Sequence, residues 1–182
     1  MIIDPQIDFI SGSLAVEGAT EKMDKLCEFV RENAEMYDQI FITVDWHPAT
    51  HLSFKENGGE WPAHCVQHTI GASVYEPLMK VVHEKMMNYV ILSKGDNEDR
   101  EEYSVFRNEY SKKIIMTVCG ILNTKDIDFC GIALDYCVKD SILDAKRELP
   151  DVNMHIYKDF SPCIGNVEEA LTNLENHGVH II

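Results

Sequence analysis

The chain has 182 residues, of which 45% are hydrophobic and 26% charged, a composition typical of a globular protein rather than a disordered or fibrous one. This length fits a single domain spanning residues 1–182, large enough to fold without disulfides or a metal ion. The formal net charge is −15, which argues against a nucleic-acid partner and against an anionic membrane. The absence of a long apolar run and of a signal-peptide pattern, with six cysteines in no C-x-x-C pair, predicts a cytoplasmic protein with reduced thiols.

Strand-like and helix-like segments alternate along the chain. The apolar pair Ile2 and Ile3 leads into Asp4, and apolar residues at helical spacing predict a helix from Thr20, placed to cap it, to about Met36. Further strands are expected at 40–44, 89–92, 127–130, 152–157 and 179–182, and further helices at 74–86, 109–123, 135–148 and 167–176. This alternation predicts a three-layer α/β/α sandwich, Rossmann-like, with a mainly parallel sheet of roughly six strands.

The segment from residue 45 to about residue 72 is too long for a plain connection and is rich in Gly, Pro, His and Trp. It contains Asp45, His47, His51 and His64, and the first two can point the same way because they lie two residues apart after a strand. Carboxylate and imidazole together suit zinc, iron or manganese better than calcium. From these residues alone, a set of exposed loop histidines is an equally good interpretation.

Cys137 follows a predicted strand and falls in the first turn of the next predicted helix, where the helix dipole favours a thiolate and a nearby ammonium would lower its pKa. A buried structural cysteine is the alternative. In a parallel sheet, however, Asp4, Asp45, Lys94 and Cys137 all fall at the carboxyl edge. Such a group can take the thiol proton, stabilise an anion and attack an acyl carbon.

These residues belong to a set of motifs spread over essentially the whole chain. In order, the motifs are Ile3-Asp4-Pro5-Gln6-Ile7-Asp8-Phe9, Asp45-Trp46-His47-Pro48 with His51, Trp61-Pro62-Ala63-His64-Cys65, Ser93-Lys94-Gly95, Tyr103-Ser104-Val105-Phe106, and Gly131 through Val138. In this combination the sequence resembles the nicotinamidases and pyrazinamidases of the isochorismatase-like cysteine hydrolase superfamily. It departs from them at Ile7, where Asn is common, and in a short first strand.

The resemblance implies a role for each matching residue. Asp4, Lys94 and Cys137 would form the catalytic triad, and the amides of Ala133 and Cys137 would form the oxyanion hole, aimed by a cis peptide bond between Ile132 and Ala133. The pyridine ring of the substrate would lie among Phe9, Trp61 and Tyr103. One divalent metal ion would be held by Asp45, His47, His51 and His64, with zinc the first expectation and iron or manganese the alternatives.

The function implied is hydrolysis of nicotinamide to nicotinate and ammonia through a cysteine thioester, in NAD salvage, with pyrazinamide as a second substrate. Two alternatives differ in class. One is a metal-free isochorismatase-like or carbamoyl hydrolase, which the four-residue ligand set argues against. The other is a non-catalytic metal-binding domain, which the intact triad argues against. The expected partner is a small molecule, and nothing in the sequence excludes a homo-oligomer.

Overall fold

The computed structural model describes residues 1–85 and 88–182 and contains one six-stranded sheet in the order β3-β2-β1-β4-β5-β6. Every pairing in it is parallel. The strands are β1 (Ile2–Ile3), β2 (Ile40–Asp45), β3 (Tyr89–Lys94), β4 (Asp126–Gly131), β5 (Asn153–Ile156) and β6 (His180–Ile181). This confirms the predicted parallel α/β fold, in which all carboxyl ends of the strands meet at one edge.

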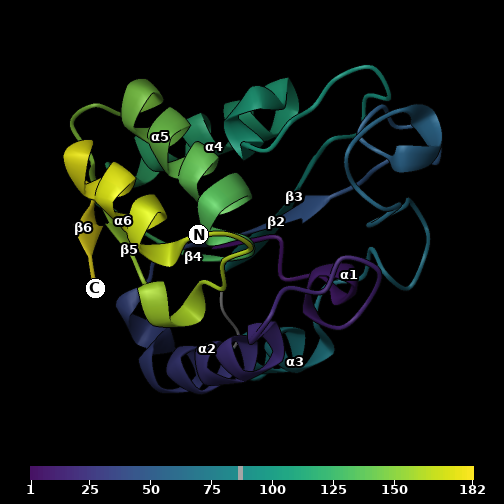
Figure 1. Ribbon diagram of the computed structural model, residues 1–182. Coiled ribbons are helices and arrows are strands. Elements are labelled where there is room, and N and C mark those ends of the chain that lie inside the picture. The colour runs from purple at the N-terminus through teal and green to yellow at the C-terminus, as the bar shows by residue number, and fades with distance from the viewer. Residues whose placement is uncertain (86–87) are drawn as a thin grey trace.

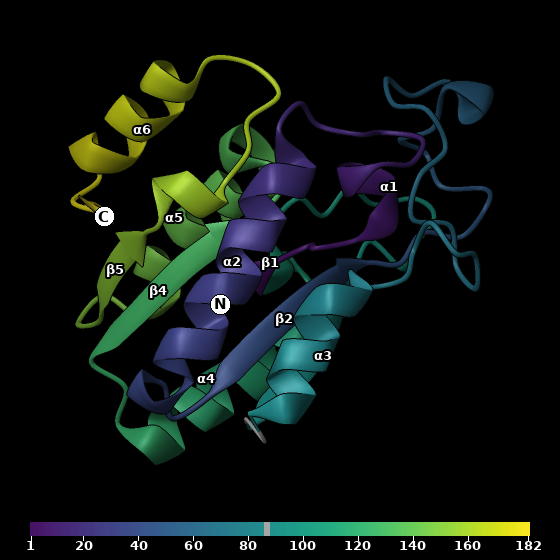
Figure 2. The same ribbon diagram turned by 90° about the horizontal axis from the view of Figure 1, so that it is seen from below.

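Helices cover both faces of the sheet, so the molecule has three layers (Figures 1 and 2). One face carries α2 (Ala19–Asn33) and α3 (Glu76–Glu84), and the other carries α4 (Glu109–Leu122), α5 (Lys139–Glu148) and α6 (Val167–Asn176). The short helix α1 (Ile7–Ile10) lies at the carboxyl edge with the long loop that follows β2. Within the described ranges, no helix is long and apolar enough to cross a membrane.

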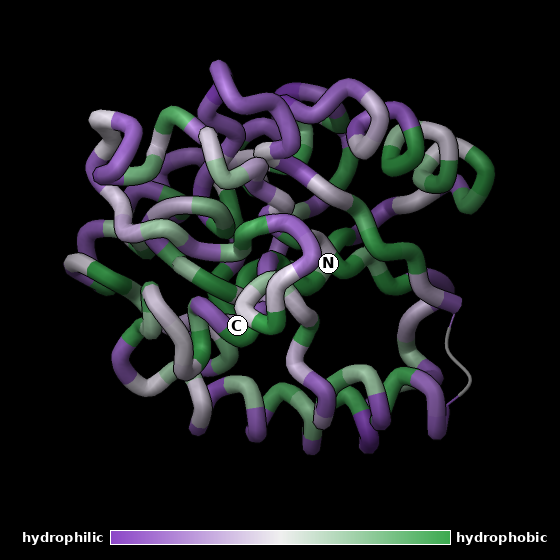
Figure 3. Tube along the Cα trace, turned by 90° about the vertical axis from the view of Figure 1, so that its right-hand side faces the viewer, coloured by the Kyte–Doolittle hydropathy of each residue, from purple (hydrophilic) through white to green (hydrophobic). Residues whose placement is uncertain are grey.

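The sheet separates two hydrophobic cores. The core under α2 and α3 includes Met23, Leu26 and Ile42, and the core under α4, α5 and α6 includes Phe129, Ile142 and Met154. Figure 3 shows the same arrangement, with hydrophobic segments running through the middle of the molecule and hydrophilic turns outside. Because β2 is buried on both sides along its whole length, its sequence is mostly apolar rather than alternating, with Thr43 and Asp45 as buried polar exceptions.

Element boundaries differ from the sequence prediction at several points. Thr20 does not cap α2: the helix begins at Ala19 after Gly18, which has a positive φ of 72°, and Thr20 lies in the first turn. The helix ends at Asn33 and a single tighter turn follows. The predicted helix 74–86 is observed as Glu76–Glu84, and Met86 is outside the described residues. Strand β3 runs two residues further than predicted, to Lys94, because it pairs with β2 up to Asp45.

Candidate active site

Four neighbouring strands each deliver one reactive group to the carboxyl edge of the sheet. Lys94 is the last residue of β3 and pairs in register with Asp45, the last residue of β2. Asp4 directly follows β1. Cys137 lies beyond the end of β4, in a π-helical turn over Leu134–Val138 that leads into α5. The predicted helix over 135–148 is therefore α-helical only from Lys139.

Lys94 lies at the centre of this group. Its Nζ is 2.8 Å from Oδ2 of Asp4, 2.5 Å from Oδ1 of Asp45 and 3.4 Å from Sγ of Cys137. All four side chains are buried, and Lys94 and Asp4 are completely so. A buried ammonium needs anionic neighbours to offset its desolvation, and here two carboxylates supply them.

Asp4 is firmly held although β1 is only two residues long. Its backbone N–H donates to the carbonyl and to Oγ1 of Thr43 in β2, each at 3.1 Å, and its Oδ1 accepts a 2.6 Å hydrogen bond from the Thr43 hydroxyl. The backbone of Asp4 is left-handed, with φ at 46°, which turns the chain out of the strand at this residue. Thr43 thus fixes one carboxylate oxygen and leaves the other to Lys94.

The two carboxylates beside Lys94 differ in proton affinity. Burial raises the pKa of Asp4, an effect that the Lys94 charge offsets only in part and that the Asp45 charge adds to. Burial also acts on Asp45, but Lys94 and His47 together outweigh it and hold the pKa of that carboxyl well below its usual value. Asp45 therefore stays ionised and balances the charge of Lys94, whereas Asp4 is the carboxyl group suited to accept and return a proton.

The Cys137 thiol departs from the sequence expectation. Burial raises its pKa well above that of a free cysteine, and the neighbouring Asp4 and Asp45 charges add to this, while the Lys94 charge lowers the pKa without compensating. The prediction that the ammonium and the helix would lower this pKa was wrong in its net direction, because complete burial beside two carboxylates outweighs the lowering by Lys94. The resting group is a neutral thiol that needs a base.

Asp45, His47 and His64 place one ligand atom each within 4.8 Å of one another, and all three residues are buried. The Nδ1 atoms of His47 and His64 lie 2.8 Å from the carbonyl oxygens of Gly95 and Pro62, so each Nδ1–H donates there. Both Nε2 atoms then keep a lone pair for a metal ion. This set of one carboxylate and two oriented imidazoles fits a divalent transition metal ion.

His51 lies beside this group but is oriented differently. Its ring stacks 4.1 Å from the His47 ring, while its Nδ1 accepts from the backbone N–H of Ser53 at 3.3 Å. Its Nε2 is 3.1 Å from the carbonyl oxygen of Arg100, to which it donates. With both nitrogens engaged, the ring has no lone pair directed at the other three ligands, and ligation by His51 would require the ring to turn.

A narrow pocket opens beside Cys137 and the metal-ligand group. The predicted ring-binding residues Phe9, Trp61 and Tyr103 all line it, and Trp61 Nε1 donates a 3.0 Å hydrogen bond to the Tyr103 hydroxyl. Residues that the sequence did not suggest also line the pocket, namely Leu14, Glu101, Tyr136 and Ile164. Burial, reinforced by the Asp45 charge, raises the pKa of Glu101. A flat aromatic molecule fits such a lining.

The backbone around Cys137 is suited to hold an oxyanion. The peptide bond between Ile132 and Ala133 is cis, as the family resemblance implied. In the described part of the chain, no hydrogen bond is donated by the amide of Ala133, a residue that also lines the pocket. The preceding Gly131 has a φ of 122°, and a Cβ there would lie 2.0 Å from the carbonyl oxygen of Ile3, so only glycine fits.

Sequence reasoning missed the residues that support the site. Thr43 orients Asp4, and the buried Glu102 accepts from the Gly95 N–H at 2.9 Å, which fixes the carbonyl that holds His47. Asp135 accepts from the N–H groups of Ile164 at 3.1 Å and Gly165 at 2.7 Å, which fixes one pocket wall. In the sequence, only the pattern Asp-x-Cys could have indicated Asp135, and no pattern indicates Thr43 or Glu102.

Comparison with known proteins agrees with this geometry. The model of the isochorismatase domain matches residues 1–182. The chain belongs to the isochorismatase family. Within that family it is 30% identical to the nicotinamidase of Saccharomyces cerevisiae over 80% of this chain and 79% of the relative. It is also 30% identical to the nicotinamidase of Escherichia coli, over 80% of this chain and 74% of the relative.

Solved structures of the isochorismatase family share the whole fold. The pyrazinamidase of Pyrococcus horikoshii in complex with zinc superposes with a TM-score of 0.83 at 31% identity, covering 100% of this chain and 96% of that one. A protein of L. infantum in complex with nicotinate has the same TM-score at 27% identity, covering 100% and 89%.

Proposed function

We propose that this isochorismatase-family protein is a nicotinamidase, which hydrolyses nicotinamide to nicotinate and ammonia in NAD salvage. The observation that carries the proposal is the joining of Asp4, Lys94 and Cys137 by contacts of 2.8 and 3.4 Å beside a pocket that Cys137 and several aromatic residues line. The nicotinamidase names of the relatives and the nicotinate bound to the L. infantum protein support the substrate.

In the first half of the reaction, Asp4 takes the proton of the Cys137 thiol, and the sulfur attacks the carboxamide carbon. The carbonyl oxygen becomes an oxyanion that the amides of Ala133 and Cys137 stabilise. Lys94 keeps its charge throughout and stabilises the thiolate. Asp4 then returns the proton to the amide nitrogen, the C–N bond breaks, and ammonia leaves a thioester on Cys137.

In the second half, Asp4 accepts a proton from water, and the resulting hydroxide attacks the thioester carbon. The C–S bond breaks, nicotinic acid is released, and the proton held by Asp4 returns to the sulfur. One carboxyl group serves both as base and as acid, which requires a pKa nearer to neutrality than that of an ordinary aspartate. The raised pKa of Asp4 supports this role.

Asp45, His47 and His64, with His51 as a fourth ligand if its ring turns, would hold one divalent metal ion, and zinc is favoured by the zinc-bound pyrazinamidase. When bound, such an ion supplies a Lewis-acid position for the ring nitrogen of the substrate. The aromatic wall of Phe9, Trp61 and Tyr103 orients the ring, so that the amide carbon faces Cys137.

The test compares ammonia release from nicotinamide and from benzamide, which lacks the ring nitrogen, with and without a chelator. The proposal expects nicotinamide to be hydrolysed much faster, and this preference to shrink after chelation. Turnover of a carbamoyl compound or isochorismate, unaffected by chelation, would favour a metal-free hydrolase. Metal binding without any hydrolysis would favour a non-catalytic domain. If the preference for nicotinamide over benzamide is the same with and without metal, the ion only stabilises the loop that carries its ligands.

A further inference from the structure

A row of polar side chains crosses three neighbouring strands on the face of the sheet that carries α2, away from the candidate active site. Asp128 of β4 pairs in register with His155 of β5, and His155 pairs in register with His180 of β6. Paired residues on neighbouring strands point to the same face of a sheet. In Figure 2, β5 lies beside α2 rather than beneath it, so this part of the face is not covered by that helix.

The first member of the row orients the second. Asp128 Oδ1 lies 2.8 Å from His155 Nδ1, which fixes the proton on Nδ1 and leaves the lone pair on Nε2. The same arrangement of carboxylate, imidazole and metal is common among metal-binding histidines, where the carboxylate raises the basicity of the ligand.

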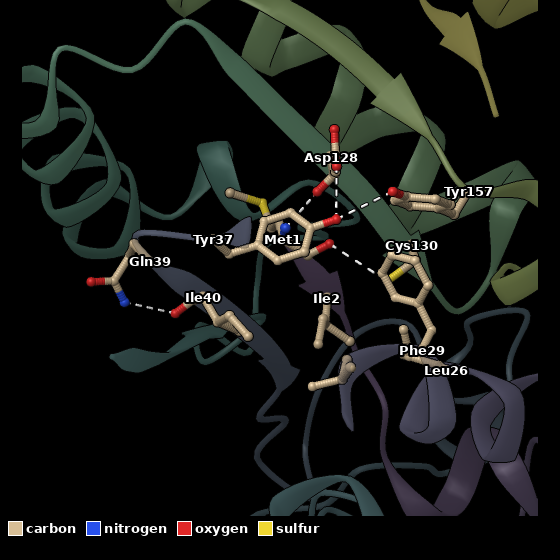
Figure 4. Close-up of a pocket in the computed structure, with 11 residues that line it drawn as sticks. Met1, Ile2, Leu26, Phe29, Tyr37, Gln39, Ile40, Asp128, Cys130 and Tyr157 are labelled. Carbon is tan, nitrogen blue, oxygen red and sulfur yellow. Dashed lines mark hydrogen bonds between the residues drawn. The ribbon is translucent and has the colours of Figure 1, made fainter. Parts of the chain in front are cut away.

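The carboxylate of Asp128 is in turn oriented by a hydrogen bond. Its Oδ2 accepts a 2.9 Å hydrogen bond from the hydroxyl of Tyr37, which lies 3.2 Å from the hydroxyl of Tyr157 (Figure 4). Burial, together with these two contacts, raises the pKa of Tyr37, so the phenol stays protonated and donates. The orientation of His155 therefore rests on a hydrogen-bonded, partly buried network and not on a freely rotating surface side chain.

The two imidazole rings are close enough to share one ion. Their ring centroids are 5.5 Å apart. Two imidazoles that share one tetrahedral ion through nitrogens at about 2.0–2.1 Å have centroids roughly 5–6 Å apart. The side chain of His155 is 23% exposed and His180 is exposed, so an ion can reach both.

From this geometry we propose a second metal site, in which His155 and His180 chelate a divalent transition metal ion on the surface of the sheet. Two imidazole nitrogens are donors that suit zinc, copper or nickel rather than magnesium or calcium. Water completes the coordination. This site is independent of the proposed nicotinamidase centre, which lies at the carboxyl edge of the sheet.

The ion would fasten β6 to the sheet. This edge strand has two residues and is paired on one side only, through His180 and Ile181. A cross-link between β5 and β6 at the position where they pair stabilises the folded state by mass action, because the unfolded chain does not hold the two imidazoles together.

The experiment titrates Zn²⁺ into protein already loaded with one equivalent, and follows the imidazole ¹⁵N resonances by NMR together with the binding heat. We expect a second equivalent that shifts His155 and His180 selectively, raises the melting temperature and slows amide exchange of Ile182, whose N–H donates to the Ile156 carbonyl at 2.9 Å. His155→Ala or His180→Ala should weaken this second equivalent at least tenfold.

Two further variants make the test specific. Asp128→Asn keeps both histidines but exchanges the carboxylate for a weaker acceptor, and we expect about tenfold weaker binding, at the lower end of the loss seen for outer-shell partners. His83→Ala removes a histidine of α3 that bonds to Tyr89 at 2.9 Å, and it should change nothing. The proposal is overturned if no second equivalent binds, or if either histidine variant binds it as well as His83→Ala does. Because these readouts do not involve amide hydrolysis, their failure would leave the proposed function untouched.

Discussion

The hydroxyl of Thr43 offers a sharp test of how Asp4 is prepared for proton transfer. Thr43→Val keeps the shape of the side chain but removes the 2.6 Å hydrogen bond to Asp4 Oδ1. Both residues are completely buried, so no water replaces the lost donor. A hydrogen bond to a charged group is worth about 1.5–3 kcal/mol, and for a chain of this size each kcal/mol lowers the melting temperature by roughly 2–4 °C. We therefore expect a fall of roughly 3–12 °C.

The same substitution should lower kcat while leaving KM nearly unchanged, because Thr43 is not among the residues that line the pocket. Thermal melts and steady-state ammonia release measure the two effects. Thr43→Ser, which keeps a hydroxyl, is the matched control and should recover most of both losses. If Thr43→Val melts within about 1 °C of the parent protein and turns over normally, the hydroxyl does not position Asp4 and the reasoning fails.

Three further outcomes follow from the site. Cys137→Ala should abolish amide hydrolysis with fold and metal content unchanged, and intact-mass analysis after nicotinaldehyde should find the adduct on Cys137 in the parent protein only. Because burial raises the pKa of the Cys137 thiol above that of a free cysteine, its alkylation by iodoacetamide should level off at higher pH than that of an exposed cysteine, and a plateau at lower pH would contradict this. Asp135→Asn loses one acceptor for the segment that carries Ile164 and should raise KM roughly twofold to tenfold with little change in kcat, because solvent around these exposed bonds reduces the worth of the carboxylate to that of an ordinary hydrogen bond. A lower kcat at unchanged KM would instead place Asp135 in the chemistry.

Much of the fold was predictable because the strands are marked by short segments rich in apolar residues. The parallel sheet follows from the alternation of such runs with helical periodicity, and the carboxyl-edge site follows from the parallel sheet. Helix ends were less predictable. Thr20 has a side chain that could cap a helix, but the helix begins after Gly18, which takes the left-handed conformation. Tertiary packing decides between these two start positions, and the local sequence does not show which one it favours.

The candidate site was predictable in identity but not in electrostatics. Asp4, Lys94 and Cys137 are marked by motifs, whereas the raised pKa of Cys137 depends on burial among charges far apart in the chain. Thr43 was invisible for a similar reason. A threonine in a buried strand is ordinary, and only the pairing of β1 with β2 brings its hydroxyl to Asp4. The role of His51 likewise depends on the carbonyl of Arg100, which no pattern near His51 indicates.

The assembly of the reactive groups from four adjacent strands also affects how activity is lost in denaturant. No local segment contains more than one member of the Asp4, Lys94 and Cys137 set, and β1, which carries Asp4, is held on both sides by β2 and β4. A partly unfolded chain that loses this central pairing retains none of the chemistry. Turnover and tertiary fluorescence should therefore decline together along a urea gradient, while the outer strand β6 frays earlier without any loss of turnover.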